Sequence, residues 1–115
     1  SGRQERGVAL AAPAGSRIER PGAVVSFTLN NTGGEAAGSG VHLDYDVYRL
    51  SVSVEGKGWT ARLINALAAV KSGASQPVAI YVSHGNGSDR SATVTLRAAS
   101  ESDPSKTATA SVIVS

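Results

Sequence analysis

Apolar and polar residues alternate with a period of two along almost the whole chain. In the clearest run, DVYRLSVSVEG from Asp46, one face carries Tyr48, Leu50, Val52 and Val54. Successive side chains of an extended strand point to opposite sides, so this pattern predicts a strand with one buried face. Several other runs alternate in the same way. The seven strands that we predict cover residues 7–15, 23–31, 46–56, 59–63, 77–83, 91–100 and 107–115.

The pattern of one segment, LINALAAVKSG, is compatible with more than one conformation. Its apolar residues Leu63, Ile64, Leu67 and Val70 have a spacing that would also suit a short amphipathic helix ending at Lys71. Because the segment is short and both flanking runs are strands, we predict an extended crossover from Leu63 to Lys71 with at most one helical turn.

Seven short strands separated by turns predict an all-β fold, an antiparallel β-sandwich. Because the chain has no cysteine, the kind that fits best is an immunoglobulin-like or fibronectin type III-like sandwich without a disulfide. We expect the first, second and fifth strands to form one sheet and the other four strands to form the second. The predicted core consists of Val25, Phe27, Leu29, Tyr48, Leu50, Val52, Trp59, Leu63, Ile80, Val82, Val94, Leu96 and Val112.

Length and composition restrict the classes of protein that remain. A chain of 115 residues is the size of one domain, which we place at residues 7–115 after a linker or disordered N-terminus at residues 1–6. The missing cysteine also excludes a thiol nucleophile and cysteine-ligated metal sites. No apolar run approaches the roughly 18 residues of a membrane helix, and the lack of methionine favours a piece cut from a longer chain. Basic and acidic residues alternate and give a net charge of +2, so we expect no nucleic acid partner and no membrane insertion.

His42, Asp44 and Asp46 form an H-x-D-x-D pattern near the start of the third predicted strand. On a strand, this spacing would direct three potential metal ligands to one side. We prefer to interpret them as polar residues at a strand entry, because a metal site needs further ligands from elsewhere. Calcium at Asp44 and Asp46 with Asp103 remains an alternative, and Asp46 could instead accept hydrogen bonds from an adjacent loop. We expect no cofactor.

No motif indicates catalysis, so we expect this domain not to be an enzyme, although its parent protein would be one. A serine hydrolase needs a turn such as G-x-S-x-G, and the turn Gly87-Ser88-Asp89 lacks the closing glycine. The glycines of Gly56-Lys57-Gly58 join two strands, whereas a dinucleotide fingerprint joins a strand to a helix. These glycines therefore predict a hairpin.

Aromatic residues matter because sugar-binding sandwiches stack pyranose rings on exposed Trp and Tyr side chains. Strand phase places Trp59, Tyr48 and Phe27 on the core side and leaves Tyr81 and Tyr45 outside. The possible glycan contacts are therefore Tyr81, Tyr45 and an exposed edge of Trp59.

Six short motifs follow one another in a recognisable order along the chain. They are Pro21-Gly22, Asn31-Thr32-Gly33, Asp46 to Leu50, Gly58-Trp59, Ser72-Gly73 and Ser100 to Pro104. In this order and spacing they resemble the alpha-galactosidase-associated NEW-type domain family. The chain departs from that family by the insertion from Gly34 to His42, and by His84-Gly85 where a proline often follows the fifth strand. The resemblance implies a bacterial immunoglobulin-like accessory module of secreted or surface-bound glycosidases and peptidases, with no catalytic residues to carry over.

The regular strands, the lack of a chemical constellation and the resemblance together predict a structural role. We expect a monomeric, non-catalytic spacer or stabilising domain, secreted or at the cell surface, whose partner is the catalytic domain of its parent hydrolase. Two alternatives remain. One is a carbohydrate-binding module for polysaccharide or cell-surface glycan, and the other is an adhesive surface repeat.

Overall fold

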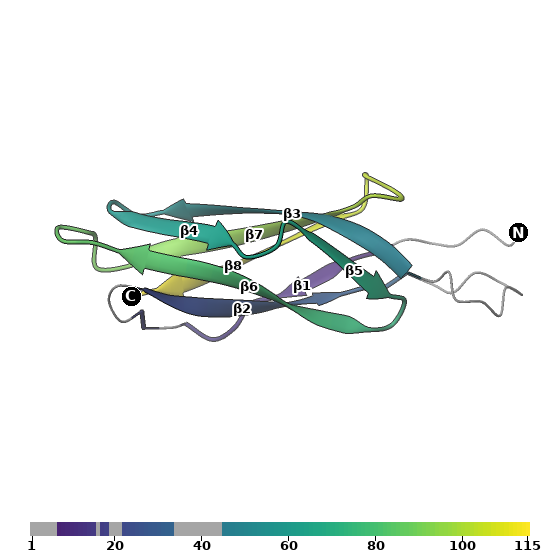
Figure 1. The fold of residues 1–115 in the computed structure, drawn as a ribbon, viewed down its shortest axis with the longest axis horizontal. Helices are drawn as coiled ribbons and strands as arrows, with labels where there is room; N and C mark the ends of the chain where they lie inside the picture. Colours follow the sequence, from purple (N-terminus) through teal and green to yellow (C-terminus); the bar gives the residue numbers. More distant parts are fainter. Residues whose placement is uncertain (1–6, 16, 19–21, 34–44) are drawn as a thin grey trace, which may run out of the picture.

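The polypeptide forms two antiparallel sheets that face each other across an apolar core (Figure 1). The structure is a computed structural model and describes residues 7–15, 17–18, 22–33 and 45–115. The predicted linker at residues 1–6 lies outside these ranges, as do His42 and Asp44. The described residues form strands and no helix, so none of them belongs to a helix that could span a membrane. The all-β prediction is therefore confirmed.

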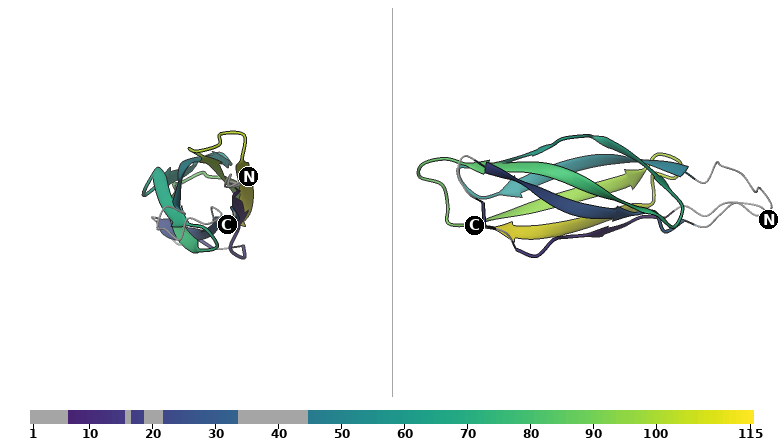
Figure 2. Two further views of the ribbon diagram at one scale, coloured as in Figure 1. Left: turned by 90° about the vertical axis from the view of Figure 1, so that its right-hand side faces the viewer. Right: turned by 60° about the horizontal axis from the view of Figure 1, so that its bottom comes forward.

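In the described part of the chain, each sheet contains four strands. The strands are β1 (Ala9–Ala11), β2 (Gly22–Asn30), β3 (Tyr45–Glu55), β4 (Trp59–Leu63), β5 (Leu67–Lys71), β6 (Ser75–His84), β7 (Ala92–Ser100) and β8 (Thr107–Val114). The first sheet has the order β1-β2-β6-β4 and the second has the order β5-β3-β7-β8. The end-on view shows the strands arranged around a common interior (Figure 2).

The chain changes sheets between β4 and β5. β4 pairs with the end of β6 in the first sheet, whereas β5 pairs with the start of β3 in the second sheet. In the link, the N–H of Ile64 donates to the carbonyl oxygen of Ala79 in β6 at 3.2 Å. Two residues later, the carbonyl oxygen of Ala66 accepts from the N–H of Leu50 in β3 at 2.8 Å. The predicted count of seven strands and the predicted place of residues 59–63 in the second sheet are therefore wrong.

The segment from Leu63 to Lys71 is extended, and the expectation of an extended crossover is confirmed. Its second half forms β5, in which Ala68 and Val70 are buried while Leu67 and Ala69 are exposed. The run is too short for its period of two to be separated from helical spacing in the sequence, so the strand itself was missed.

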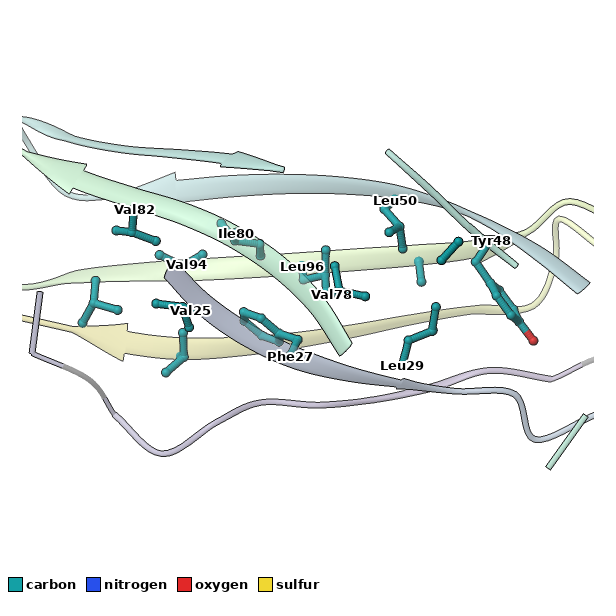
Figure 3. Close-up of a cluster of buried hydrophobic side chains, with 14 of the residues drawn as sticks. Val25, Phe27, Leu29, Tyr48, Leu50, Val78, Ile80, Val82, Val94 and Leu96 are labelled. Atoms are coloured by element: carbon teal, nitrogen blue, oxygen red, sulfur yellow. The ribbon is translucent and has the colours of Figure 1, made fainter. Parts of the chain in front are cut away.

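Side chains of both sheets fill the interior, as the close-up shows for Phe27, Leu29, Tyr48, Ile80 and Leu96 (Figure 3). All predicted core residues are buried except Val52 and Leu63, which are half-buried. Leu63 ends β4 where the chain leaves the first sheet. Val52 lies beyond the part of β3 that β5 covers, so β3 is an edge strand at that point. The core also contains Ile18, Ala68, Val70, Val78, Ala92, Ala98 and Val114.

Candidate functional site

Two groups of hydrogen-bonded polar side chains lie at the start of β3 and at the end of β6. These two strand ends are at opposite ends of the sandwich (Figure 1). One surrounds Asp46 at the start of β3, beside the turn between β7 and β8. The other surrounds His84 at the end of β6, beside the turn between β3 and β4. Each group joins segments that are distant in the sequence and is a candidate for chemistry or binding.

Asp46 is buried, with 2% of its surface exposed, and accepts three hydrogen bonds. Its Oδ1 accepts from the backbone N–H of Val47 and from the hydroxyl of Ser102, both at 2.8 Å. Its Oδ2 accepts from the hydroxyl of Ser100, whose oxygen in turn accepts from the N–H of Asp103 at 3.0 Å. Asp46 therefore fixes the turn between β7 and β8 onto the start of β3.

Of the three residues in the predicted calcium alternative, Asp46 and Asp103 lie within the described residues. Asp103 accepts from the hydroxyl of Ser105 at 2.6 Å and from the N–H of the same residue at 3.2 Å. Within the described ranges, no three His, Asp or Glu side chains gather in a group that could hold a metal ion. The carboxylate of Asp46 accepts hydrogen bonds from a neighbouring turn, mainly from serine hydroxyls.

His84 engages both of its ring nitrogens. Nε2 lies 2.9 Å from the carbonyl oxygen of Ile18, and Nδ1 lies 3.3 Å from the hydroxyl oxygen of Ser88. Because a carbonyl only accepts, Nε2 carries a proton, and in the neutral ring Nδ1 accepts from Ser88. The ring also stacks on Trp59, with centroids 4.3 Å apart. His84 therefore connects the segment before β2 to the loop after β6.

Among the residues that the structure describes, the pair of Ser88 and His84 does not extend into a Ser-His-Asp triad. Asp89 follows Ser88, but its Oδ2 accepts from the backbone N–H of Lys57 at 2.8 Å. The N–H of Asp89 also donates to the carbonyl oxygen of Lys57 at 2.9 Å. In a triad the carboxylate would instead orient the imidazole. These contacts brace the loop after β6 against the hairpin turn between β3 and β4.

The three predicted glycan contacts lie apart. Trp59 is 5% exposed, and its Nε1–H donates to the carbonyl oxygen of Asp89 at 2.8 Å. Tyr81 is half-buried on the outer face of the first sheet, with the Arg62 guanidinium carbon 5.9 Å from its ring centroid. Tyr45 is 54% exposed on the outer face of the second sheet. The structure does not bring these three rings onto one surface.

An exposed apolar surface on the second sheet was missed by the sequence reasoning. We call it the β3–β5 face and define it by Tyr45, Val47, Leu67 and Ala69. In the register of the two strands, Val47 lies opposite Ala69, and Tyr45 lies opposite Lys71. Tyr45, Val47 and Leu67 are 54%, 38% and 54% exposed. The signal was the alternation in LAAVK, which places Leu67 and Ala69 on the outer side once the segment is a strand.

Arg49 borders the β3–β5 face, opposite Leu67 in the register, and pairs with Glu101. Its Nε donates to Oε2 at 3.2 Å and its Nη2 to Oε1 at 3.1 Å. The hydrogen bonds and the charge of Glu101 raise the pKa of the Arg49 guanidinium above its ordinary value. Both side chains are exposed, so the pair balances charge at this border and contributes little to stability.

Comparisons with known proteins identify relatives of the chain. A family model described as "Peptidase M6-like domain" matches residues 7–115. A protein of the fungus Arthroderma benhamiae named "Putative secreted metallopeptidase" is 46% identical over 98 residues. This match covers 77% of the chain and 14% of the relative, so the chain spans a small part of the relative's length. No solved structure matches the chain.

The resemblance to the alpha-galactosidase-associated NEW-type domain family is wrong, because a different family model matches nearly the whole chain. The short turn motifs on which the resemblance rested recur in many sandwiches, since Gly, Pro, Asn and Ser suit turns in any of them. The expectations of a bacterial source and of an association with glycosidases lose their support as well. The relative is fungal and its name is that of a peptidase.

Proposed function

Because this chain belongs to the Peptidase M6-like domain family, we propose that it is a non-catalytic accessory domain that stabilises and positions the catalytic part of a secreted metallopeptidase. The fungal relative supports the proposal, since the matched region takes only 14% of its length and leaves ample chain for a separate catalytic part. The predicted secreted location is confirmed by the name of this relative.

The observation that carries the proposal is the use of the chemically capable side chains. Both ring nitrogens of His84 are engaged in contacts between loops. The buried carboxylate of Asp46 accepts hydrogen bonds from two serine hydroxyls and a backbone N–H. A metallopeptidase centre needs His, Asp or Glu side chains that are free to bind the metal and to activate water. In the part of the chain that the structure describes, these two groups support loops instead.

We further infer that the sandwich is of the immunoglobulin-like or fibronectin type III-like kind. The grouping of β1, β2 and β6 in one sheet and of β3, β7 and β8 in the other supports this inference. A structure determined by crystallography or NMR, compared with sandwiches of both kinds, tests it. A strand order without β3 beside β7 would contradict it.

Deletion of this domain from the full-length peptidase tests the accessory role. We expect the truncated enzyme to turn over short peptide substrates at nearly the normal kcat/KM, because the reacting groups lie elsewhere. We also expect it to inactivate at a lower temperature and to cleave large folded substrates more slowly. Loss of short-peptide turnover, with the catalytic part still folded by circular dichroism, would contradict the proposal.

Carbohydrate binding through Tyr45, Tyr81 and Trp59 stays a second prediction, and an adhesive repeat a third. The separation of the three rings ranks carbohydrate binding below the accessory role. Retention of the domain on a polysaccharide, abolished by Tyr45→Ala, would reverse this ranking.

A further inference from the structure

The β3–β5 face gathers exposed apolar side chains at one corner of the molecule. Among the described residues the large apolar side chains that are exposed are Val24, Tyr45, Val47, Ile64, Leu67 and Ile113. Three of them belong to the β3–β5 face, and Ile64 lies in the link that leads into β5. Single exposed apolar residues are ordinary, whereas adjacent ones mark contact surfaces.

Most of the other outward positions of the same sheet are polar, and the large apolar exception is Ile113 near the end of β8. On β7 and β8 the outward positions include Thr95 and Ser111, whose hydroxyl groups are 2.8 Å apart. Arg97 and Thr109 lie opposite each other and are also exposed. Ile113 lies opposite Thr93. Neighbouring exposed apolar side chains are therefore found at the start of β3 and on β5, and they are not a general property of the sheet.

The strand β5 also has a free edge. Within the described residues it pairs only with β3 and ends the order of the second sheet. Edge strands of isolated domains are commonly protected by proline or by several charges. β5 carries neither protection along its length, and Lys71 at its end is its one charged residue. An edge of this kind beside an apolar face is suited to contact with another protein surface.

We propose that the β3–β5 face, with the free edge of β5, docks onto an apolar surface of the catalytic part of the same polypeptide. This inference rests on the proposed function, because it names the surface through which the accessory domain would act. The occupant follows from the relative, in which most of the chain lies outside the matched region. A tethered neighbour is present at an effective concentration of roughly millimolar, so a small contact is sufficient. Interfaces between domains of one chain cover about 600–1,500 Å² in total, within reach of one sheet corner.

The test compares two double variants in the full-length peptidase. Val47→Thr with Leu67→Thr makes the β3–β5 face polar while keeping good strand-forming residues. The matched control, Val24→Thr with Ile113→Thr, changes side chains that are 57% and 63% exposed and lie outside the face. Hydrogen exchange at the backbone amides of Leu67–Lys71, read by mass spectrometry, reports whether the surface is covered.

We expect these amides to exchange about tenfold faster or more in the face variant than in the wild type. The variant loses two apolar side chains that docking would bury. The control should exchange at the wild-type rate. Equal exchange in both variants would overturn the proposal. A wild-type dimer that the face variant converts to a monomer, measured by sedimentation, would also overturn it, because the face would then join two copies of the chain.

The outcomes separate this inference from the proposed function. If deletion of the domain abolishes short-peptide turnover while the face variant shows faster exchange, the surface is correct and the accessory role is wrong. If deletion leaves turnover intact while both double variants exchange alike, the accessory role stands and the docking surface lies elsewhere.

Discussion

Replacing Asp46 with alanine should destabilise the domain through the hydroxyl group of Ser100. Ser100 is 1% exposed, so its hydroxyl cannot find water when its acceptor is removed. Hydrogen bonds to a charged group contribute about 1.5–3 kcal/mol each, and a stranded buried donor costs about 1–3 kcal/mol. Of the other two groups that donate to Asp46, the hydroxyl of Ser102 is exposed and regains a hydrogen bond to water. We therefore expect Asp46→Ala to lower the free energy of unfolding by about 3–4 kcal/mol, and Tm by on the order of 10 °C or more.

A double-mutant cycle isolates this contact. Ser100→Ala alone should cost about 2 kcal/mol. The double variant should cost less than the sum of the single variants, with a coupling energy on the order of 1–2 kcal/mol, since the two side chains touch. Urea unfolding supplies the free energies, and the fluorescence of Trp59, the single tryptophan, reports the transition. The control Ser105→Ala, an exposed position in the same turn, should stay within about 0.5 kcal/mol of the wild type.

Two outcomes of these measurements would contradict the prediction. Strict additivity of Asp46→Ala and Ser100→Ala would show that the two side chains do not share a buried hydrogen bond. A cost for Asp46→Ala no larger than that of the exposed control would refute the role of the carboxylate in fixing the turn.

Three further predictions follow from packing, backbone geometry and charge. Leu29→Ala should cost about 2–5 kcal/mol, seen as a lower urea midpoint with an unchanged m-value, because the side chain is fully buried. Gly58→Ala should destabilise more than Gly87→Ala in thermal unfolding. Both glycines have positive φ (79° and 76°), but an added Cβ at Gly58 would lie 2.8 Å from the loop after β6, while the one at Gly87 meets nothing within 4 Å. Arg49→Met and Glu101→Gln should leave Tm unchanged and insensitive to salt, because the pair is exposed; a clear fall in Tm for either would contradict this reading.

Part of the candidate site could be predicted from the sequence. Strand phase placed Trp59 in the core and Tyr81 and Tyr45 outside, which the burial of Trp59 and the exposure of Tyr45 match. The acceptor role of Asp46 was also foreseen as one interpretation. Its serine partners were not, because Ser100 and Ser102 are more than 50 residues away and no local pattern connects them. The contact of His84 with Ile18 was missed for the same reason.

The sequence by itself determined which side of each clear strand is buried, because side chains alternate with a period of two whatever the strand pairs with. It therefore identified the all-β class and most of the large core side chains, although Ile18, Val70 and Val114 were not among them. Only the tertiary structure decided which sheet a short strand joins. Residues 59–63 and 67–71 have similar lengths and alternation, yet β6 pairs with one and β3 with the other. That choice depends on backbone hydrogen bonds to distant strands, and it turns Leu67 and Ala69 outward beside Val47 to form the β3–β5 face.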